Sequence, residues 1–114
     1  MGGNKMLKNI NINGKEYKMA SSAYTIFAYK NFTGRDLLKD AVEIEENTST
    51  DLDSTINTIE KVLQMAYVMN HEADSTFGNY DDFLRSIDVI LTKENDVKWM
   101  QEVLELATHP FQAG

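Results

Sequence analysis

A long stretch of helical periodicity lies in the middle of the chain. Between residues 52 and 70, mostly apolar side chains recur at every third or fourth position and form one helical face. That face consists of Leu52, Ile56, Ile59, Leu63, Ala66, Tyr67 and Asn70, and its second half is widened by Val62, Met65 and Met69. Because a helix that is apolar over more than one stripe packs against several neighbours, the pattern predicts a central, buried helix.

Two short segments of alternating apolar and polar residues come first in the chain. Residues 7–12 and 15–20 flank Asn13-Gly14, which is the preferred pair for a type I′ turn because both central residues need positive φ. The predicted facing pairs are Ile12 and Lys15, Ile10 and Tyr17, and Lys8 and Met19. Since an isolated hairpin is marginal in water, its apolar face is expected to lie on helices or on another subunit's strands.

Four further helices are predicted, over residues 23–32, 35–45, 80–91 and 93–108. Their expected ends are marked by Ser22 and Asn79 as N-caps, Gly34 as a C-cap, Thr92 as an N-cap and His109-Pro110 as a stop. The first helix is expected to bury a face made of Tyr24, Phe27 and Ala28, with Asn31 and Phe32 as further candidates for the same face. The second is expected to bury Leu37, Leu38, Ala41, Val42 and Ile44, with Asp36, Asp40 and Glu43 on its wet side.

These elements predict an α+β, mostly α-helical fold. An N-terminal β-hairpin over about residues 6–20 packs on a bundle of about five helices over about residues 22–109, within a single domain of residues 1–114. At 114 residues and 42% hydrophobic, the chain is long enough for one modest core. No apolar run approaches the roughly 20 residues that a membrane span needs, and no apolar segment near residue 1 indicates a secretory signal.

Charge and composition exclude several classes of function. The formal net charge of −7 argues against nucleic acid or an anionic membrane as a partner. The absence of cysteine excludes disulfides, thiol catalysis and cysteine-based zinc sites. The acidic stretch over residues 43–53 reads as a solvated linker, with a docking surface as the alternative.

Candidate chemistry is sparse. His71, Glu72 and Asp74 lie close in sequence but lack the spacing of a helical zinc motif, and His109 is explained by the dipole of a helix end. There is no phosphate-binding glycine loop and no nucleophile with a partner base. We therefore expect no catalytic residues, no metal and no cofactor.

Several short segments occur in a suggestive order. They are Ile-Asn-Ile-Asn-Gly-Lys-Glu-Tyr at 10–17, Phe-Thr-Gly-Arg-Asp-Leu-Leu at 32–38, Ala-Tyr at 66–67, Asp-Phe-Leu at 82–84, and Ala-Thr-His-Pro-Phe at 107–111 after Trp99. In this order, length and acidity the chain resembles the tail assembly chaperones of long-tailed (siphovirus-type) bacteriophages and prophages of Gram-positive hosts. The resemblance covers most of the chain.

The resemblance implies a non-enzymatic role. Such chaperones bind the long helical tape-measure protein, keep it soluble, help recruit tail tube subunits and often self-associate. They act in the cytoplasm of the bacterial host, and the protein is not expected in the mature virion. An acidic adaptor that binds a basic protein is the alternative, and a small enzyme or metal protein using His71, Glu72 and Asp74 is the third hypothesis.

The expected partner-binding surface is apolar, because a chaperone must cover exposed aliphatic stripes and burial of apolar area is the main favourable term. We expect two faces to exceed what a small core can cover. They are the hairpin face (Ile10, Ile12, Tyr17 and Met19) and the C-terminal stripe (Trp99, Val103 and Leu106).

Overall fold

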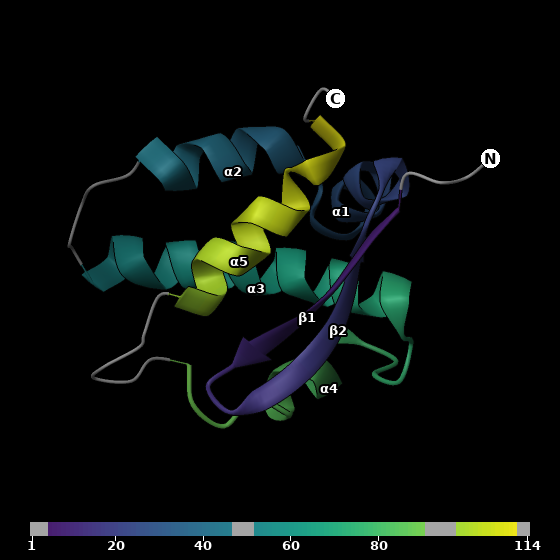
Figure 1. Cartoon of the computed structure of the whole chain (residues 1–114). Helices are drawn as coiled ribbons and strands as arrows, with labels where there is room; N and C mark the ends of the chain where they lie inside the picture. Colours follow the sequence, from purple (N-terminus) through teal and green to yellow (C-terminus); the bar gives the residue numbers. More distant parts are fainter. Residues whose placement is uncertain (1–4, 47–51, 91–97, 112–114) are drawn as a thin grey trace.

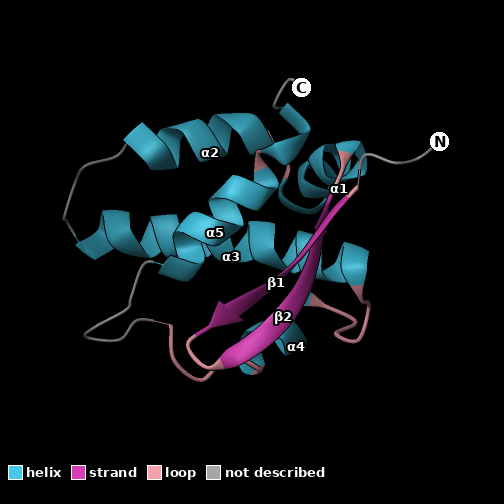
Figure 2. Ribbon diagram, viewed as in Figure 1, coloured by secondary structure: helices cyan, strands magenta, loops and turns pink. Residues whose placement is uncertain are grey.

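The structure is a computed structural model that describes residues 5–46, 52–90 and 98–111 (Figure 1). The described residues form a two-stranded antiparallel sheet followed by five α-helices and one turn of 3-10 helix, so the predicted α+β, mostly helical class is confirmed (Figure 2). The elements are β1 (Met6–Ile12), β2 (Lys15–Ser21), α1 (Ala23–Thr33), α2 (Leu37–Glu46), α3 (Leu52–Ala73), α4 (Tyr80–Arg85), α5 (Lys98–Ala107) and the 3-10 helix His109–Phe111.

The hairpin has the predicted register and turn. Ile10 lies opposite Tyr17, and the turn residues Asn13 and Gly14 have φ values of 49° and 107°. The N–H of Gly14 donates to the side chain of Asn11 at 2.7 Å. The Asn13 amide also donates to two carbonyls of the segment after α4, those of Val89 and Ile90, at 2.7 Å each. The turn is therefore fixed both locally and by a distant part of the chain.

α3 lies at the centre of the molecule. The hairpin, α5 and α1 all pack on it, and α5 crosses its front face while α2 runs above it in Figure 1. The second half of α3 is buried on several sides, as the broad apolar pattern predicts: Val62, Met65, Ala66 and Met69 are each at most 1% exposed. Ile56, expected on the same face, is 53% exposed because it lies near the start of α3, beyond the span of the hairpin.

α1 is oriented differently from the prediction. Its buried residues are Thr25 and Tyr29, whereas Tyr24 and Phe27 are 64% and 65% exposed. The cause is polar: Ser22 Oγ and Thr25 Oγ1 donate to the Glu72 carboxylate of α3 at 2.7 and 2.6 Å. This pair of bonds turns the Thr25 side of α1 towards α3 and leaves the aromatic side outside.

α2 shows a related difference. Asp40, expected on the wet side, is 3% exposed, whereas Leu38 and Val42 are 43% and 40% exposed. Leu37 and Ala41 are buried as expected. The helix turns Asp40 inward because the carboxylate there has two strong hydrogen-bond donors, the side chains of Tyr29 and Arg35.

α4 is capped by Asn79 as predicted but ends at Arg85 instead of continuing to residue 91. Ser86 Oγ donates to the Phe83 carbonyl at 2.6 Å and also hydrogen-bonds the Tyr17 hydroxyl at 2.7 Å. These bonds tie the chain to the hairpin where the helix stops. The expected cap Thr92, the start of the last predicted helix and the middle of the acidic stretch lie outside the described residues.

Candidate functional site

The seven residues predicted to bind a partner lie in the core. Each of them is at most 4% exposed. They are Ile10, Ile12, Tyr17, Met19, Trp99, Val103 and Leu106. The expectation that these two faces exceed what the core covers is therefore wrong, because α3 and α5 together cover the hairpin face. In this conformation the seven side chains hold the fold together and offer no contact area to a partner.

The apolar side chains that reach the surface come mainly from the helices. The most exposed helical pair is Tyr24 and Phe27, one turn apart on α1. Tyr24, Phe27 and the exposed Asn31 one further turn along are here called the outer face of α1. The exposed Lys30, one turn after Phe27, borders this face. Elsewhere on the surface, less exposed apolar side chains are those of Leu38 and Val42 on α2 and of Ile56 on α3.

Phe32, also on α1, belongs to a cluster of aromatic rings that meet in tilted and edge-on arrangements. Its ring centroid lies 5.2 Å from that of Tyr67 and 5.3 Å from that of Tyr80, and Phe32 itself is 41% exposed. Burial raises the pKa of Tyr80 to about 12, and the nearby Glu60 charge adds to the rise. Tyr80 therefore stays neutral at ordinary pH, and the three rings anchor the end of α1 to α3 and α4.

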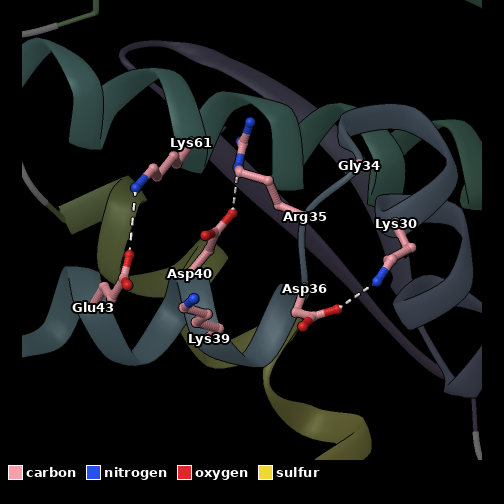
Figure 3. Close-up of a pocket in the computed structure, with 8 residues that line it drawn as sticks. All are labelled: Lys30, Gly34, Arg35, Asp36, Lys39, Asp40, Glu43 and Lys61. Carbon is pink, nitrogen blue, oxygen red and sulfur yellow. Dashed lines mark hydrogen bonds and ion pairs between the residues drawn. The ribbon is translucent and has the colours of Figure 1, made fainter.

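A polar cluster joins α1, α2 and α3 around Arg35 (Figure 3). The guanidinium donates to Asp40 Oδ2 at 2.8 Å, to the Tyr29 hydroxyl at 3.2 Å, and to the side-chain oxygen of Gln64. Tyr29 in turn donates to Asp40 Oδ2 at 2.6 Å. We call these four residues the Arg35 cluster. The Asp40 carboxylate is buried, and a buried charge is stabilised only when hydrogen-bonding partners surround it. Tyr29 and Arg35 are those partners here.

The electrostatics of the Arg35 cluster fix its protonation states. Burial raises the pKa of Tyr29, and its hydrogen bond to Asp40 raises it further, so the phenol remains a donor. Burial lowers the pKa of Arg35, but the hydrogen bonds to Asp40 and Tyr29 outweigh that effect and raise it overall. Arg35 therefore stays charged, and the Tyr29 phenol stays neutral and donates to Asp40.

An open hollow of about 310 Å³ lies over this cluster, lined by residues of both signs (Figure 3). Lys30 pairs with Asp36 at 3.1 Å, and Lys61 pairs with Glu43 at 3.7 Å. With the pair of Arg35 and Asp40, three of the four cations that line the hollow are paired, and Lys39 has no salt-bridge partner among the described residues. Most of its charge thus serves to join the helices. The sequence signal for it was weak: Gly34-Arg35-Asp36 reads as one helix ending and another beginning, which it also is.

The histidine and carboxylate segment at the end of α3 is used structurally. Glu72 accepts from Ser22 and Thr25, and the His71 ring lies 5.8 Å from that of Tyr67. Hydrogen bonds from the Thr76 side chain and backbone lower the pKa of Asp74. Within the described ranges, no group of three or more His, Asp or Glu side chains is placed to hold a metal ion.

Comparison of this chain with known protein families, with curated proteins and with solved structures gives no match. None of the helices among the described residues has both the length and the apolar character needed to cross a bilayer. The surface chemistry of the chain and the order of its sequence segments are therefore what bear on function.

Proposed function

We propose that this chain is a phage tail assembly chaperone. In this role it is a non-enzymatic protein that binds the tape-measure protein, keeps it soluble and helps recruit tail tube subunits. The resemblance in segment order supports the role. The observation that carries it is the outer face of α1, where two large aromatic side chains, Tyr24 and Phe27, are each more than 60% exposed.

The physical fit is with a helical partner. A tape-measure helix exposes apolar stripes before assembly, and an amphipathic helix is bound through residues spaced by about one turn. Tyr24 and Phe27 have that spacing on α1. Covering about 100 Å² of each side chain would contribute roughly 2–3 kcal/mol per residue at about 25 cal/mol per Å². Aromatic rings suit such a surface because they lose little side-chain entropy on binding.

This surface replaces the hairpin face and the C-terminal stripe as the proposed binding site. Those two faces are needed inside the core, whereas truncating Tyr24 or Phe27 removes little buried area from the fold. Surface substitutions of this kind usually change stability by no more than about 0.5 kcal/mol. The binding role can therefore be tested without disturbing the structure.

The acidic-adaptor alternative receives less support. An adaptor for a basic partner needs unpaired carboxylates spaced along one exposed face. On and just before α2, however, three carboxylates are each paired with a cation: Asp36 with Lys30, Asp40 with Arg35, and Glu43 with Lys61. Their charge is thus partly neutralised within the chain.

The test is co-expression with a tape-measure protein, which the proposal expects to be a very long helical chain encoded near this gene. Variant Tyr24→Ser/Phe27→Ser should lower the soluble yield of the tape-measure protein and its co-purification at least about fivefold. The two lost contacts contribute roughly 2–3 kcal/mol each, and about 1.4 kcal/mol is already a factor of ten in affinity. The matched control is Val42→Ser/Ile56→Ser, which also removes two exposed apolar side chains but from α2 and α3. Equal yields with the two double variants would contradict the proposed surface.

A further inference from the structure

The hairpin turn contains the one Asn-Gly pair of the sequence, Asn13-Gly14. In such a pair an asparagine side chain reacts most readily with its own backbone, because glycine has no Cβ that would shield its nitrogen from the neighbouring side-chain carbonyl. Asparagine counts among the thermolabile residues. The pair that makes the turn therefore also carries a reactive group.

The reaction is deamidation, and it needs only the two residues and water. The backbone nitrogen of Gly14 attacks Cγ of Asn13, a C–N bond forms, and the side-chain nitrogen leaves as ammonia with the proton of the Gly14 N–H. Water then opens the resulting succinimide ring at either of its carbonyls. The products are aspartate at position 13 or isoaspartate, in which the backbone runs through the former side chain. Neither step is an oxidation or a reduction.

In the folded chain both reacting groups are engaged elsewhere. The Asn13 amide nitrogen donates to the carbonyls of Val89 and Ile90 at 2.7 Å each, which uses both of its hydrogens. The Gly14 N–H donates to Asn11 Oδ1 at 2.7 Å. These bonds hold the amide and the attacking nitrogen on different partners, so the ring cannot close until they open.

The Asn13 amide also belongs to a joint between distant parts of the chain. The carbonyl of Ile90 accepts from Asn13 and, at 3.0 Å, from the indole N–H of Trp99 on α5. Trp99 is 2% exposed, so this carbonyl connects the turn to the core. In Figure 1 the hairpin turn lies beside the segment that follows α4.

We propose that Asn13 is a gated deamidation site, protected while the turn is held on residues 89 and 90 and converted to aspartate or isoaspartate when the turn opens. A carboxylate has no hydrogen to donate to the two carbonyls. Isoaspartate adds a backbone atom to a two-residue turn, so the pairing of Ile12 with Lys15 changes as well. Conversion therefore releases the segment after α4 from the hairpin, and it cannot reverse once ammonia has left.

The rate of conversion in the folded chain should report how often the turn opens. Three hydrogen bonds must break, and each typically shifts such an equilibrium several-fold. Two of them reach residues 76 and 77 positions away in sequence, so local fraying of the turn is not sufficient. This inference is independent of the proposed chaperone role.

The first test measures deamidation at position 13 by peptide mapping and mass spectrometry after incubation at mildly alkaline pH. In the natural chain it should be at least about tenfold slower in buffer than in urea. Asn11→Ala removes the acceptor of the Gly14 N–H and should raise the rate in buffer at least about threefold. The matched control, Asn9→Ala, is exposed on the same strand and should leave the rate unchanged. Equal rates in buffer and urea, or in the two variants, would overturn the proposal.

The second test examines the consequence with a stable mimic of the product. Asn13→Asp keeps the size of the side chain but cannot donate to the carbonyls of Val89 and Ile90. The indole N–H of Trp99, the only tryptophan, should then exchange with deuterated solvent at least about fivefold faster. Asn9→Asp adds the same charge at an exposed position of the hairpin and should leave this exchange unchanged. Equal exchange in the two variants would overturn the release of the segment after α4.

Discussion

Tyr29 and Asp40, eleven residues apart, are joined by a hydrogen bond of 2.6 Å in which the phenol donates to a carboxylate with only 3% of its residue surface exposed. Arg35, which lies between them in sequence, donates to both. The bond links α1 directly to α2 through side chains, in addition to the short segment that connects the two helices along the chain. It also explains why Asp40 points inward on a helix whose apolar pattern would turn it outward.

Removing the Tyr29 hydroxyl should therefore destabilise the protein. In Tyr29→Phe, Asp40 stays buried but loses one donor, and an incompletely satisfied buried group costs about 1–3 kcal/mol. The measurement is the free energy of unfolding in urea. Tyr24→Phe removes the same hydroxyl from a residue that is 64% exposed and should change the free energy by less than about 0.5 kcal/mol. Equal losses of unfolding free energy in Tyr29→Phe and Tyr24→Phe would show that the hydrogen bond between Tyr29 and Asp40 does not stabilise the fold.

The stability of the protein should depend on the protonation of Tyr29 at alkaline pH. Tyr29 has its pKa raised in the folded state, so its stabilising effect is complete below the unfolded pKa of about 10 and is lost as pH rises above it. Tyr17 and Tyr80 also have raised pKa values, mainly through burial. In unfolding measurements between about pH 10 and 12, the decline in stability should be less steep in Tyr29→Phe, by up to about 1.4 kcal/mol per pH unit. The same decline of stability with pH in Tyr29→Phe as in the natural chain would contradict the attribution of this loss to Tyr29.

The hairpin turn gives a third prediction. Gly14 has φ of 107°, a backbone conformation that residues with a Cβ atom rarely adopt. A Cβ added at this position would have no other atom within 4 Å, so steric overlap is not the obstacle. Gly14→Ala should therefore lower the free energy of unfolding by about 1–2 kcal/mol through backbone strain alone. Gly78→Ala is the matched control, because that glycine has an ordinary φ and equally open space. Its effect should stay within about 0.5 kcal/mol, and similar losses at both positions would exclude turn strain as the cause.

The parts of the fold that sequence predicts best are those fixed by neighbours along the chain. Asn13-Gly14 determines the turn and hence the register, and Ser22, Gly34 and Asn79 mark helix ends through local hydrogen bonds. The long apolar pattern of α3 likewise predicts its central place, because no other segment is apolar over so many turns.

The parts that sequence predicts poorly depend on contacts between distant residues. The orientation of α1 follows from bonds of Ser22 and Thr25 to Glu72, about fifty residues away, which no local pattern reports. Large aromatic residues such as Phe27 are usually buried, so the periodicity favoured the wrong face. The expected exposure of the hairpin face was wrong for a similar reason: whether that face is covered depends on how α3 and α5 pack.

The most direct test of the central claim is the affinity of this chain for a purified helical segment of the tape-measure protein, measured by calorimetry at about 0.05 and 0.5 M salt, where the Debye length falls from about 14 to 4 Å. If apolar contacts through the outer face of α1 carry the binding, the dissociation constant should change less than about threefold with salt. It should rise at least about tenfold in Phe27→Ser, and the heat capacity change should be negative. Binding that disappears in high salt and is unaffected by Phe27→Ser would contradict the account and favour an acidic adaptor.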